Sequence, residues 1–165
     1  MLIKSDKKLK EVKIFKTSIF KDSRGQIWTK WDKKTLKNKS INLSKLTISK
    51  KNVLRGFHGD TKSWKLVSCI KGNVLNVVVD YRKNSKNYLK YSSFILNDKN
   101  KNSILIPPKF LNSWLCLSKD CIYSYDYSFK GNYNDVNKQI SVKWNDERIH
   151  YNWPLKKPIL SFRDK

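Results

Sequence analysis

Strand-length runs of apolar residues, separated by turn-forming residues, fill most of the chain after residue 52. The runs are rich in Val, Ile and Leu, which favour strands. Many short strands at regular spacing predict an all-β barrel or jelly roll. The predicted strands cover residues 53–58, 64–70, 74–81, 88–96, 103–106, 114–117, 122–129 and 140–144.

The first fifty residues show a weaker pattern. Two short extended segments are predicted within residues 14–20. The Asp, Ser and Gly of residues 21–25 predict a turn, and Asp32 is expected to cap a short helical turn over residues 32–36. Residues 41–48 alternate apolar and polar side chains, which is the period of a half-buried strand. The N-terminal part is therefore expected to add strands and short helical segments to the barrel.

The run from Val74 to Asp80 has two different faces. One face is wholly apolar and is expected to pack outward onto another sheet. The other face would place Asn76 inside the barrel, where a buried amide needs hydrogen-bonding partners, so a polar interior is implied. The Gly and Asn of residues 71–73 predict a hairpin before this run, and the prolines at 107–108 must end a later strand.

The length and composition indicate one ordinary domain spanning residues 1–165. No apolar stretch approaches the roughly 18 residues of a membrane helix, and residues 1–10 lack the apolar segment of a secretory signal. The odd number of cysteines, Cys69, Cys116 and Cys121, indicates reduced thiols. Cys69 and Cys116 lie in apolar strand-like runs and are expected to be core residues. A cytoplasmic protein with no membrane partner is expected.

A formal net charge of +23 raises the question of nucleic-acid binding, because clustered Lys and Arg bind phosphate backbones. The excess is mostly lysine spread from Lys4 to Lys165, with no dedicated basic tail and no recognised nucleic-acid motif. We interpret the charge as a solvated surface that also favours anionic ligands. Nucleic acid is not the expected partner.

The segment from Leu54 to Asp60 carries the most conspicuous chemistry. It places His58, one of only two histidines, three residues after Arg55 and seven before Lys65. We interpret His58 as a catalytic base in a β-barrel pocket, and His150 as a surface residue. With two histidines in all, a metal site built from several His ligands is not expected. No metal or cofactor is therefore predicted.

Nine short motifs in a fixed order make the chain similar to a known family. The chain resembles the dTDP-4-dehydrorhamnose 3,5-epimerase family of nucleotide-sugar epimerases. The resemblance implies a cupin-type jelly roll and a homodimer in which N-terminal strands cross to the partner. The motifs are Asp22-Ser23-Arg24-Gly25, Asn52 to His58, Lys65-Leu66-Val67, Gly72 with Asp80 to Ser85, Ile106 to Phe110, Leu117-Ser118, Trp144-Asn145-Asp146, Trp153-Pro154 and Leu160 to Asp164.

The resemblance implies metal-free epimerisation of a 4-keto sugar carried on a nucleoside diphosphate. It implies that His58, paired with Asp164, removes the proton next to the ketone. Tyr125 would return a proton from the opposite face, and Lys65 would lie close to the developing enolate. This division of roles is chemically sound, because inverting such a carbon needs a base on one face and an acid on the other. A fixed cation near the ketone oxygen lowers the barrier.

Arginines are the implied ligands of the diphosphate and sugar. Arg24 and Arg55 match family arginines with this role, and the planar guanidinium suits it. Arg163, next to the closing aspartate, is a further binding candidate. Phe129 and Tyr133 lie near the region where the family stacks the nucleotide.

The chain also departs from the family pattern. Asn112 stands where the family has a second histidine, and Asn76 where it has an aspartate, so hydrogen bonding is kept while ionisation is removed. Both asparagines, and Asp60 after the variant Gly59, are candidate substrate-binding residues. These variants resemble a branch that acts on GDP-linked 4-keto-6-deoxyheptoses in capsule synthesis, which is the favoured substrate ahead of dTDP-4-keto-6-deoxyglucose.

Several alternatives stay open at this point. The nucleotide, the sugar and the number of inverted carbons are not fixed, and Tyr123 or Tyr127 could replace Tyr125 as the acid, because all three lie on one face of a strand. A 3,4-ketoisomerase of the same fold would move the carbonyl instead. A non-catalytic sugar- or nucleic-acid-binding β-barrel is the alternative from a different class.

Overall fold

The computed structural model describes residues 1–37, 39–134 and 136–165. None of the helices in this described part is long and apolar enough to cross a membrane. The strands are β1 (Leu2–Ser5), β2 (Lys13–Lys16), β3 (Ile19–Asp22), β4 (Gly25–Trp28), β5 (Leu43–Lys50), β6 (Leu54–Gly59), β7 (Trp64–Lys71), β8 (Asn73–Asp80), β9 (Tyr91–Asn97), β10 (Ser103–Ile106), β11 (Phe110–Cys116), β12 (Asp120–Ser128) and β13 (Ile140–Val142). The 3-10 helices are η1 (Val136–Lys138) and η2 (Phe162–Asp164).

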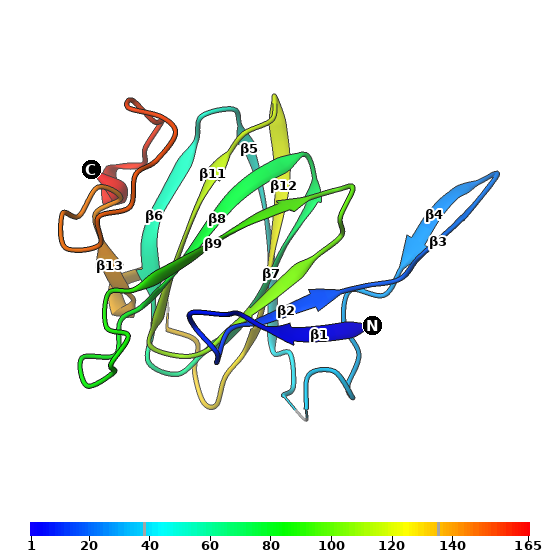
Figure 1. Cartoon of the computed structure of the whole chain (residues 1–165), viewed down its shortest axis with the longest axis horizontal. Coiled ribbons are helices and arrows are strands. Elements are labelled where there is room, and N and C mark those ends of the chain that lie inside the picture. Colours follow the sequence, from blue (N-terminus) through cyan, green and yellow to red (C-terminus); the bar gives the residue numbers. More distant parts are fainter. Residues whose placement is uncertain (38, 135) are drawn as a thin grey trace.

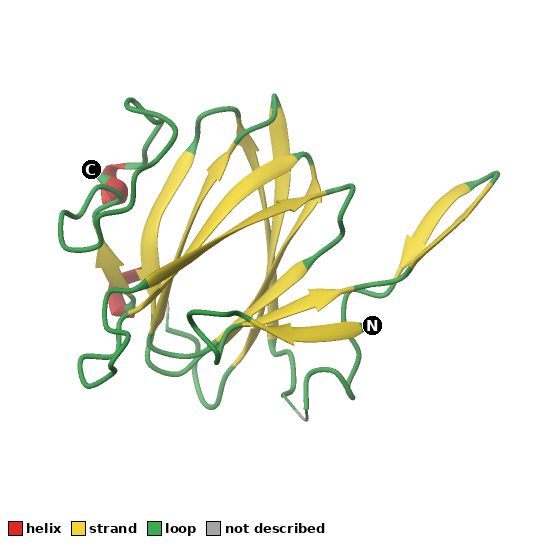
Figure 2. Ribbon diagram, viewed as in Figure 1, coloured by secondary structure: helices red, strands yellow, loops and turns green. Residues whose placement is uncertain are grey.

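Two antiparallel sheets face each other and form the barrel (Figures 1 and 2). The six-stranded sheet has the order β1-β2-β10-β7-β12-β5, and the five-stranded sheet has the order β13-β6-β11-β8-β9. The hairpin β3–β4 forms a separate two-stranded sheet that projects away from the barrel in Figure 1. This arrangement confirms the predicted all-β jelly roll with added N-terminal strands.

Local sequence signals account for most of the element boundaries. Gly72, at φ 85°, makes the tight turn between β7 and β8 that its residue type predicts. Asp32 caps the helical turn after β4, because its Oδ1 accepts the amide hydrogen of Thr35 at 2.7 Å. Pro107 and Pro108 end β10, but β11 then begins at Phe110, four residues earlier than predicted.

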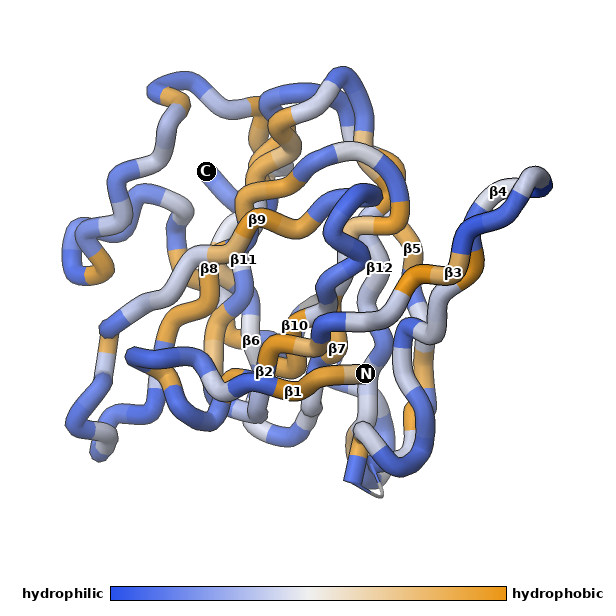
Figure 3. Tube along the Cα trace, turned by 45° about the vertical axis from the view of Figure 1, so that its right-hand side comes forward, coloured by the Kyte–Doolittle hydropathy of each residue, from blue (hydrophilic) through white to orange (hydrophobic). Residues whose placement is uncertain are grey.

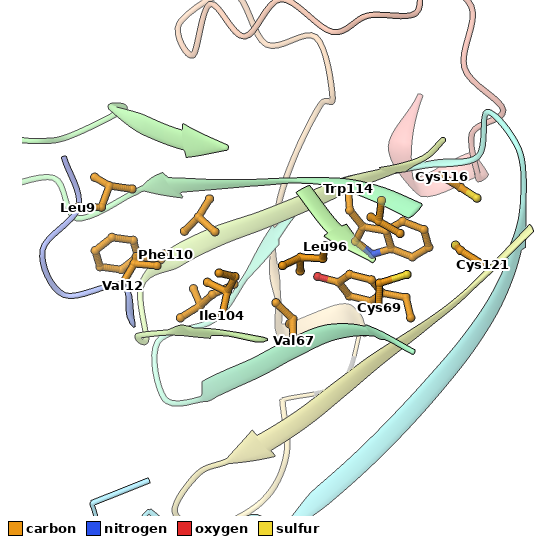
Figure 4. Packing of buried hydrophobic residues seen from close by; sticks show 14 residues of the cluster. Leu9, Val12, Val67, Cys69, Leu96, Ile104, Phe110, Trp114, Cys116 and Cys121 are labelled. Carbon is orange, nitrogen blue, oxygen red and sulfur yellow. The ribbon is translucent and has the colours of Figure 1, made fainter. Parts of the chain in front are cut away.

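The apolar core fills the interior between the middle strands of the two sheets. Its members come from β7 to β12 and from the loop between β1 and β2, as Figure 4 shows for Val67, Leu96 and Trp114. The three cysteines are buried in this region, as predicted for Cys69 and Cys116. Burial raises the pKa of the Cys69 thiol to about 12, which keeps that residue in the thiol form.

The apolar outer face of β8 corrects one prediction. Val77 and Val79 do not pack onto another sheet; they pack beneath the segment from Trp144 to Leu160, which supplies Ile149 and Trp153. That segment carries enough aromatic and aliphatic side chains to cover the face without forming strands. Figure 3 shows how apolar stretches concentrate in the strands, whereas the connecting loops are largely hydrophilic.

The predicted half-buried strand at residues 41–48 is present as β5, an edge strand. Its apolar pattern reverses along its length, however. Leu46 and Ile48 are 66% and 79% exposed, while Lys45 and Thr47 line the interior cavity, to which Leu46 also contributes. The interior is polar beside β5, so the apolar side chains there lie on the outer surface.

Candidate functional site

A cavity of about 350 Å³ opens between the edge strands of the two sheets. One wall is formed by β5, β7 and β12, and the other by β6 and β11. The loop before β13 and the C-terminal turn close its sides. The residues that line it are Lys45, Leu46, Thr47, Arg55, Gly56, His58, Lys65, Asn112, Tyr125, Tyr127, Tyr133, Gln139, Ser161, Arg163 and Asp164.

His58 and Asp164 meet on the wall of the five-stranded sheet. Strand β6 points the half-buried imidazole into the cavity, and the helix η2 brings the C-terminal turn back over the barrel. His58 Nε2 lies 2.8 Å from Asp164 Oδ1. The predicted pair, 106 residues apart in sequence, is therefore brought together.

The carboxylate of Asp164 is buried and held by three groups. Its Oδ1 accepts the Gly56 amide hydrogen at 3.0 Å, and its Oδ2 accepts the Ser161 hydroxyl hydrogen at 2.7 Å. Burial by itself would raise the pKa of Asp164, but His58, Ser161 and the Gly56 amide together hold that pKa below its usual value. Asp164 is therefore an anion whose carboxylate orients the imidazole of His58.

Gly56 permits this contact because it has no side chain. A Cβ atom on Gly56 would lie 2.6 Å from Asp164 Oδ1 and 3.4 Å from the carbonyl oxygen of Val142. Both neighbours occupy the space that any larger residue would need. Gly56 and Ser161 are functional residues that sequence reasoning missed, although each lies inside one of the motifs quoted above.

Tyr125 lies on the opposite wall, on β12. Its hydroxyl oxygen accepts the indole N–H of Trp114 at 2.6 Å, so the phenol proton is not used in that contact. Burial raises the pKa of Tyr125 to about 12, although Trp114 and Arg55 act in the opposite direction. Tyr125 is therefore a protonated acid with its proton available to a ligand.

The neighbouring tyrosines have other surroundings. Tyr123 is fully buried and donates its hydroxyl hydrogen to Asn76 Oδ1. Tyr127 lines the cavity, packs against the ring of Tyr133 and has its pKa raised, chiefly by burial. Of the three tyrosines on this face, Tyr123 does not line the cavity, which favours Tyr125 over it.

Lys65 is a buried ammonium group at the floor of the cavity. Its Nζ donates to the carbonyl oxygen of His58 at 3.3 Å and lies 3.7 Å from Asp60 Oδ2. Burial lowers the pKa of Lys65, while the charge of Asp60 opposes that shift. The amine is therefore fixed beside the backbone of the predicted base, where it can stabilise negative charge.

Positive charge dominates the lining. Among the described residues of the lining, Lys45, Arg55, Lys65 and Arg163 accompany one carboxylate, that of Asp164. The Arg55 guanidinium carbon lies 5.6 Å from the centre of the Trp114 ring, and Arg163 donates to Gln139 Oε1 at 3.2 Å. An anionic ligand such as a diphosphate suits this surface.

Three of the candidate binding residues do not line the cavity. Asp60 is buried behind Lys65 and accepts the amide hydrogens of Lys62 and Ser63 at 2.9 and 2.6 Å. Asn76 is fully buried behind Tyr123. Arg24 lies in the turn between β3 and β4, where it pairs with Asp22 at 2.7 Å. This hairpin projects away from the barrel (Figure 1). None of the three therefore faces the cavity of its own chain, and their binding roles stay predictions.

The placement of the remaining histidine agrees with prediction, since His150 is exposed. Among residues 1–37, 39–134 and 136–165, no group of three or more His, Cys, Asp or Glu side chains is arranged to hold a metal ion.

Known proteins are similar to this chain in both sequence and fold. The model of a family described as dTDP-4-dehydrorhamnose 3,5-epimerase matches residues 6–165. The enzyme of that name from Salmonella typhimurium is 32% identical, with 99% of this chain and 93% of that protein covered. The one from Escherichia coli is also 32% identical, with 88% and 82% covered.

Solved structures of epimerases have a fold similar to that of this chain. The crystal structure of the dTDP-6-deoxy-D-glucose-3,5-epimerase from Legionella pneumophila, in complex with dTDP-4-keto-L-rhamnose, has a TM-score of 0.90 at 27% identity. The alignment covers 99% of this chain and 89% of that chain. This likeness confirms the cupin-type jelly roll.

Proposed function

This chain belongs to the dTDP-4-dehydrorhamnose 3,5-epimerase family and is an enzyme of the isomerase class. On that basis we propose that it inverts carbon 3, carbon 5 or both of a nucleoside-diphosphate 4-keto-6-deoxy sugar. The observation that carries this proposal is the opposed placement of two groups across one cavity. His58 with Asp164 lies on the five-stranded sheet, and Tyr125 lies on the six-stranded sheet.

In the proposed mechanism, His58 removes the proton from the carbon next to the ketone. Asp164 keeps the imidazole oriented and stabilises the imidazolium that forms. Lys65 stabilises the enolate oxygen, and Tyr125 delivers its proton to the opposite face of the same carbon. The new C–H bond forms as the enolate collapses to the ketone, and solvent exchange then restores the protonation states of His58 and Tyr125.

We propose a dTDP-linked sugar as the preferred substrate, because the relatives reported above carry that nucleotide in their names and the Legionella enzyme was crystallised with such a sugar. The GDP-linked heptose was favoured in part by Asp60. Since that carboxylate is buried behind Lys65 and makes turn hydrogen bonds, it offers no direct contact to distinguish the sugars. The heptose is retained as the second substrate in the test.

The test is incubation with dTDP- and GDP-linked 4-keto-6-deoxy sugars in deuterated water, with position-resolved NMR. We expect deuterium at carbon 3, carbon 5 or both, and loss of exchange by about 10²- to 10⁴-fold in His58→Gln, because a positioned base contributes about that much. His150→Gln is the matched control and should exchange at the wild-type rate. Full exchange in His58→Gln would remove His58 as the base. A moved carbonyl would indicate a 3,4-ketoisomerase, and binding without any exchange a non-catalytic barrel.

We also propose a homodimer in which the β3–β4 hairpin of one copy reaches the cavity of the other. The hairpin exposes Phe20 and Ile27, and β5 beside the cavity mouth exposes Leu46 and Ile48. Pairing these apolar surfaces would bring Arg24 to a partner's diphosphate. We expect sedimentation to give a dimer mass, and mixtures of Arg24→Ala and His58→Gln to recover activity, since a mixed dimer would contain one intact site. No recovery in a mixture shown to contain mixed dimers would place Arg24 outside the site.

A further inference from the structure

A row of hydrogen bonds, here called the relay, joins Asn76, Tyr123 and Asn112 in the barrel interior and ends at the cavity. From the direction in which these hydrogen bonds are donated we infer that Asn112 presents its carbonyl oxygen to the ligand. This oxygen accepts a hydrogen bond from a sugar hydroxyl and so sets the orientation of the sugar ring. The inference rests on the proposed function, because it names the substrate group that this part of the site recognises. Asn112 is then a specificity residue, distinct from the groups that move protons.

The polarity follows from counting protons along the relay. Tyr123 is fully buried, and its single hydroxyl proton is donated to Asn76 Oδ1. The phenol oxygen can therefore only accept from its other neighbour. Asn112 Nδ2 lies 3.5 Å from that oxygen. The NH₂ group of Asn112 is thus directed toward Tyr123, and its carbonyl oxygen takes no part in this row of hydrogen bonds.

That carbonyl oxygen has an unmet requirement. Asn112 is 5% exposed and lines the cavity, and its Oδ1 has no hydrogen-bond partner among the described residues. A buried acceptor without a donor is costly, so the ligand is expected to supply one. A ketone oxygen or a phosphate oxygen cannot donate, whereas a sugar hydroxyl can.

Lys65, in the same cavity, needs a hydrogen-bond acceptor, whereas Asn112 needs a donor. Its ammonium group is a donor and never an acceptor, so it suits the ketone oxygen. Strand pairing places Asn112 directly opposite His58 across the β6–β11 ladder. A 4-keto sugar with its ketone toward Lys65 and a hydroxyl toward Asn112 is therefore held in one orientation relative to the base.

Two sources could supply the hydroxyl. One is a ring hydroxyl at carbon 2 or carbon 3, which hexoses and heptoses share. The other is the side-chain hydroxyl of a 6-deoxyheptose, which a 6-deoxyhexose lacks. The chemistry at Asn112 is the same in both cases, so the substrates in the test must separate them.

The test compares wild type with Asn112→Leu, which keeps the size of the side chain and removes its hydrogen bonds. Each protein is assayed for deuterium exchange with the 4-keto-6-deoxyhexose, its 2-deoxy and 3-deoxy analogues, and the 4-keto-6-deoxyheptose. In wild type, loss of the recognised hydroxyl should lower kcat/KM by about 10- to 100-fold. In Asn112→Leu, the same loss should have no effect, because the acceptor is already absent.

Tyr123→Phe provides a second, nearly isosteric variant that does not alter Asn112 itself. It frees the amide to turn, so discrimination between the hydroxy and deoxy sugars should weaken. Tyr91→Phe, on β9 and outside the cavity, is the matched control and should retain it. Thermal unfolding of each variant separates a folding defect from lost recognition.

The outcomes distinguish this inference from the proposed function. Equal sensitivity of wild type and Asn112→Leu to every hydroxyl, with normal exchange, overturns the role of Asn112 alone. The opposite polarity, with the Asn112 amide donating to the ketone, would also be revealed by that result. If wild type exchanges no sugar, the proposed function fails, and the same hydroxyl comparison is made on the Kd of dTDP-6-deoxyglucose and its deoxy analogues. Failure to bind any of these overturns both.

Discussion

The two sides of the barrel interior are built from some of the same strands yet have opposite character. On the closed side, between β7–β10 and β8–β9, the side chains are apolar and close-packed. On the open side, between β5–β12 and β6, they are mostly charged or hydroxylated and leave a cavity. Strands β7, β11 and β12 contribute to both sides. Alternate residues on β12, for example, place Tyr123 in the core and Tyr125 in the cavity.

The difference shows what holds the cavity side chains in position. Trp114 stacks on Tyr123 in the core, with ring centres 4.5 Å apart, and its indole N–H holds the Tyr125 hydroxyl. A core residue therefore fixes a cavity residue directly. Because close-packed interiors have few alternative arrangements, groups anchored in this way keep their geometry.

The closed side should carry stability and no chemistry of its own. Leu96 on β9 is 1% exposed in the apolar core, so Leu96→Ala should lower the free energy of unfolding by about 2–5 kcal/mol. The exchange rate per folded molecule should not change, because Leu96 is not a cavity residue. Denaturant unfolding and active-site-normalised exchange measure the two effects.

Ile95→Ala is the control for this change. Ile95 lies next to Leu96 on the same strand but is 46% exposed, and its truncation should cost less than about 1 kcal/mol. A large loss of exchange per folded Leu96→Ala molecule would mean that the closed side participates in the chemistry, and the division between the two sides would not hold.

The open side should show the reverse pattern, and Gly56 tests it without removing a catalytic side chain. In Gly56→Ala the added Cβ would collide with Asp164 Oδ1, so the carboxylate must move away from His58. We expect a loss of about 100-fold in kcat/KM, because a displacement of about 1 Å can cost that much. Gly131→Ala is the control for a glycine substitution without a collision: its Cβ would meet open space, so the cost there is backbone strain at φ 69°, and the activity per folded molecule should not change. Unchanged activity in Gly56→Ala would show that catalysis does not need Asp164 at its observed position.

Much of this fold could be predicted from the sequence, because strand propensity and turn chemistry are local properties. The hairpin at Gly72 and the cap at Asp32 follow from residue type alone. The outward packing of Val77 and Val79 was predicted, but not what covers them. Irregular segments such as residues 144–160 carry no periodic signal, so their docking cannot be inferred from pattern.

The site was partly predictable for a different reason. Motif order identified His58, Tyr125, Asp164 and Lys65, which all line the cavity. It could not show that Asp60 lies behind Lys65, since burial depends on how the 60–63 turn folds back. The support that Trp114 gives to Tyr125 was also missed. Trp114 is two residues after Asn112 and so lies on the same face of the strand, and this spacing was the available signal for its role.

The smallest predicted effect is the contribution of the Asp164 charge to the free energy of unfolding. It separates the open side from the closed side, where the side chains are apolar. Its folded-state pKa lies below the ordinary value of 3.8, so its charge stabilises the fold above that value. The contribution is lost as the pH falls through the lower folded-state pKa. The difference in unfolding free energy between wild type and Asp164→Asn should therefore be constant near neutral pH and shrink on acidification below about pH 4. Repeating the measurement in a His58→Gln background removes the adjacent imidazole as a second titrating group. A difference that does not shrink on acidification would mean that the folded state does not favour the carboxylate over the acid, and the charge pairing that defines the open side would have to be abandoned.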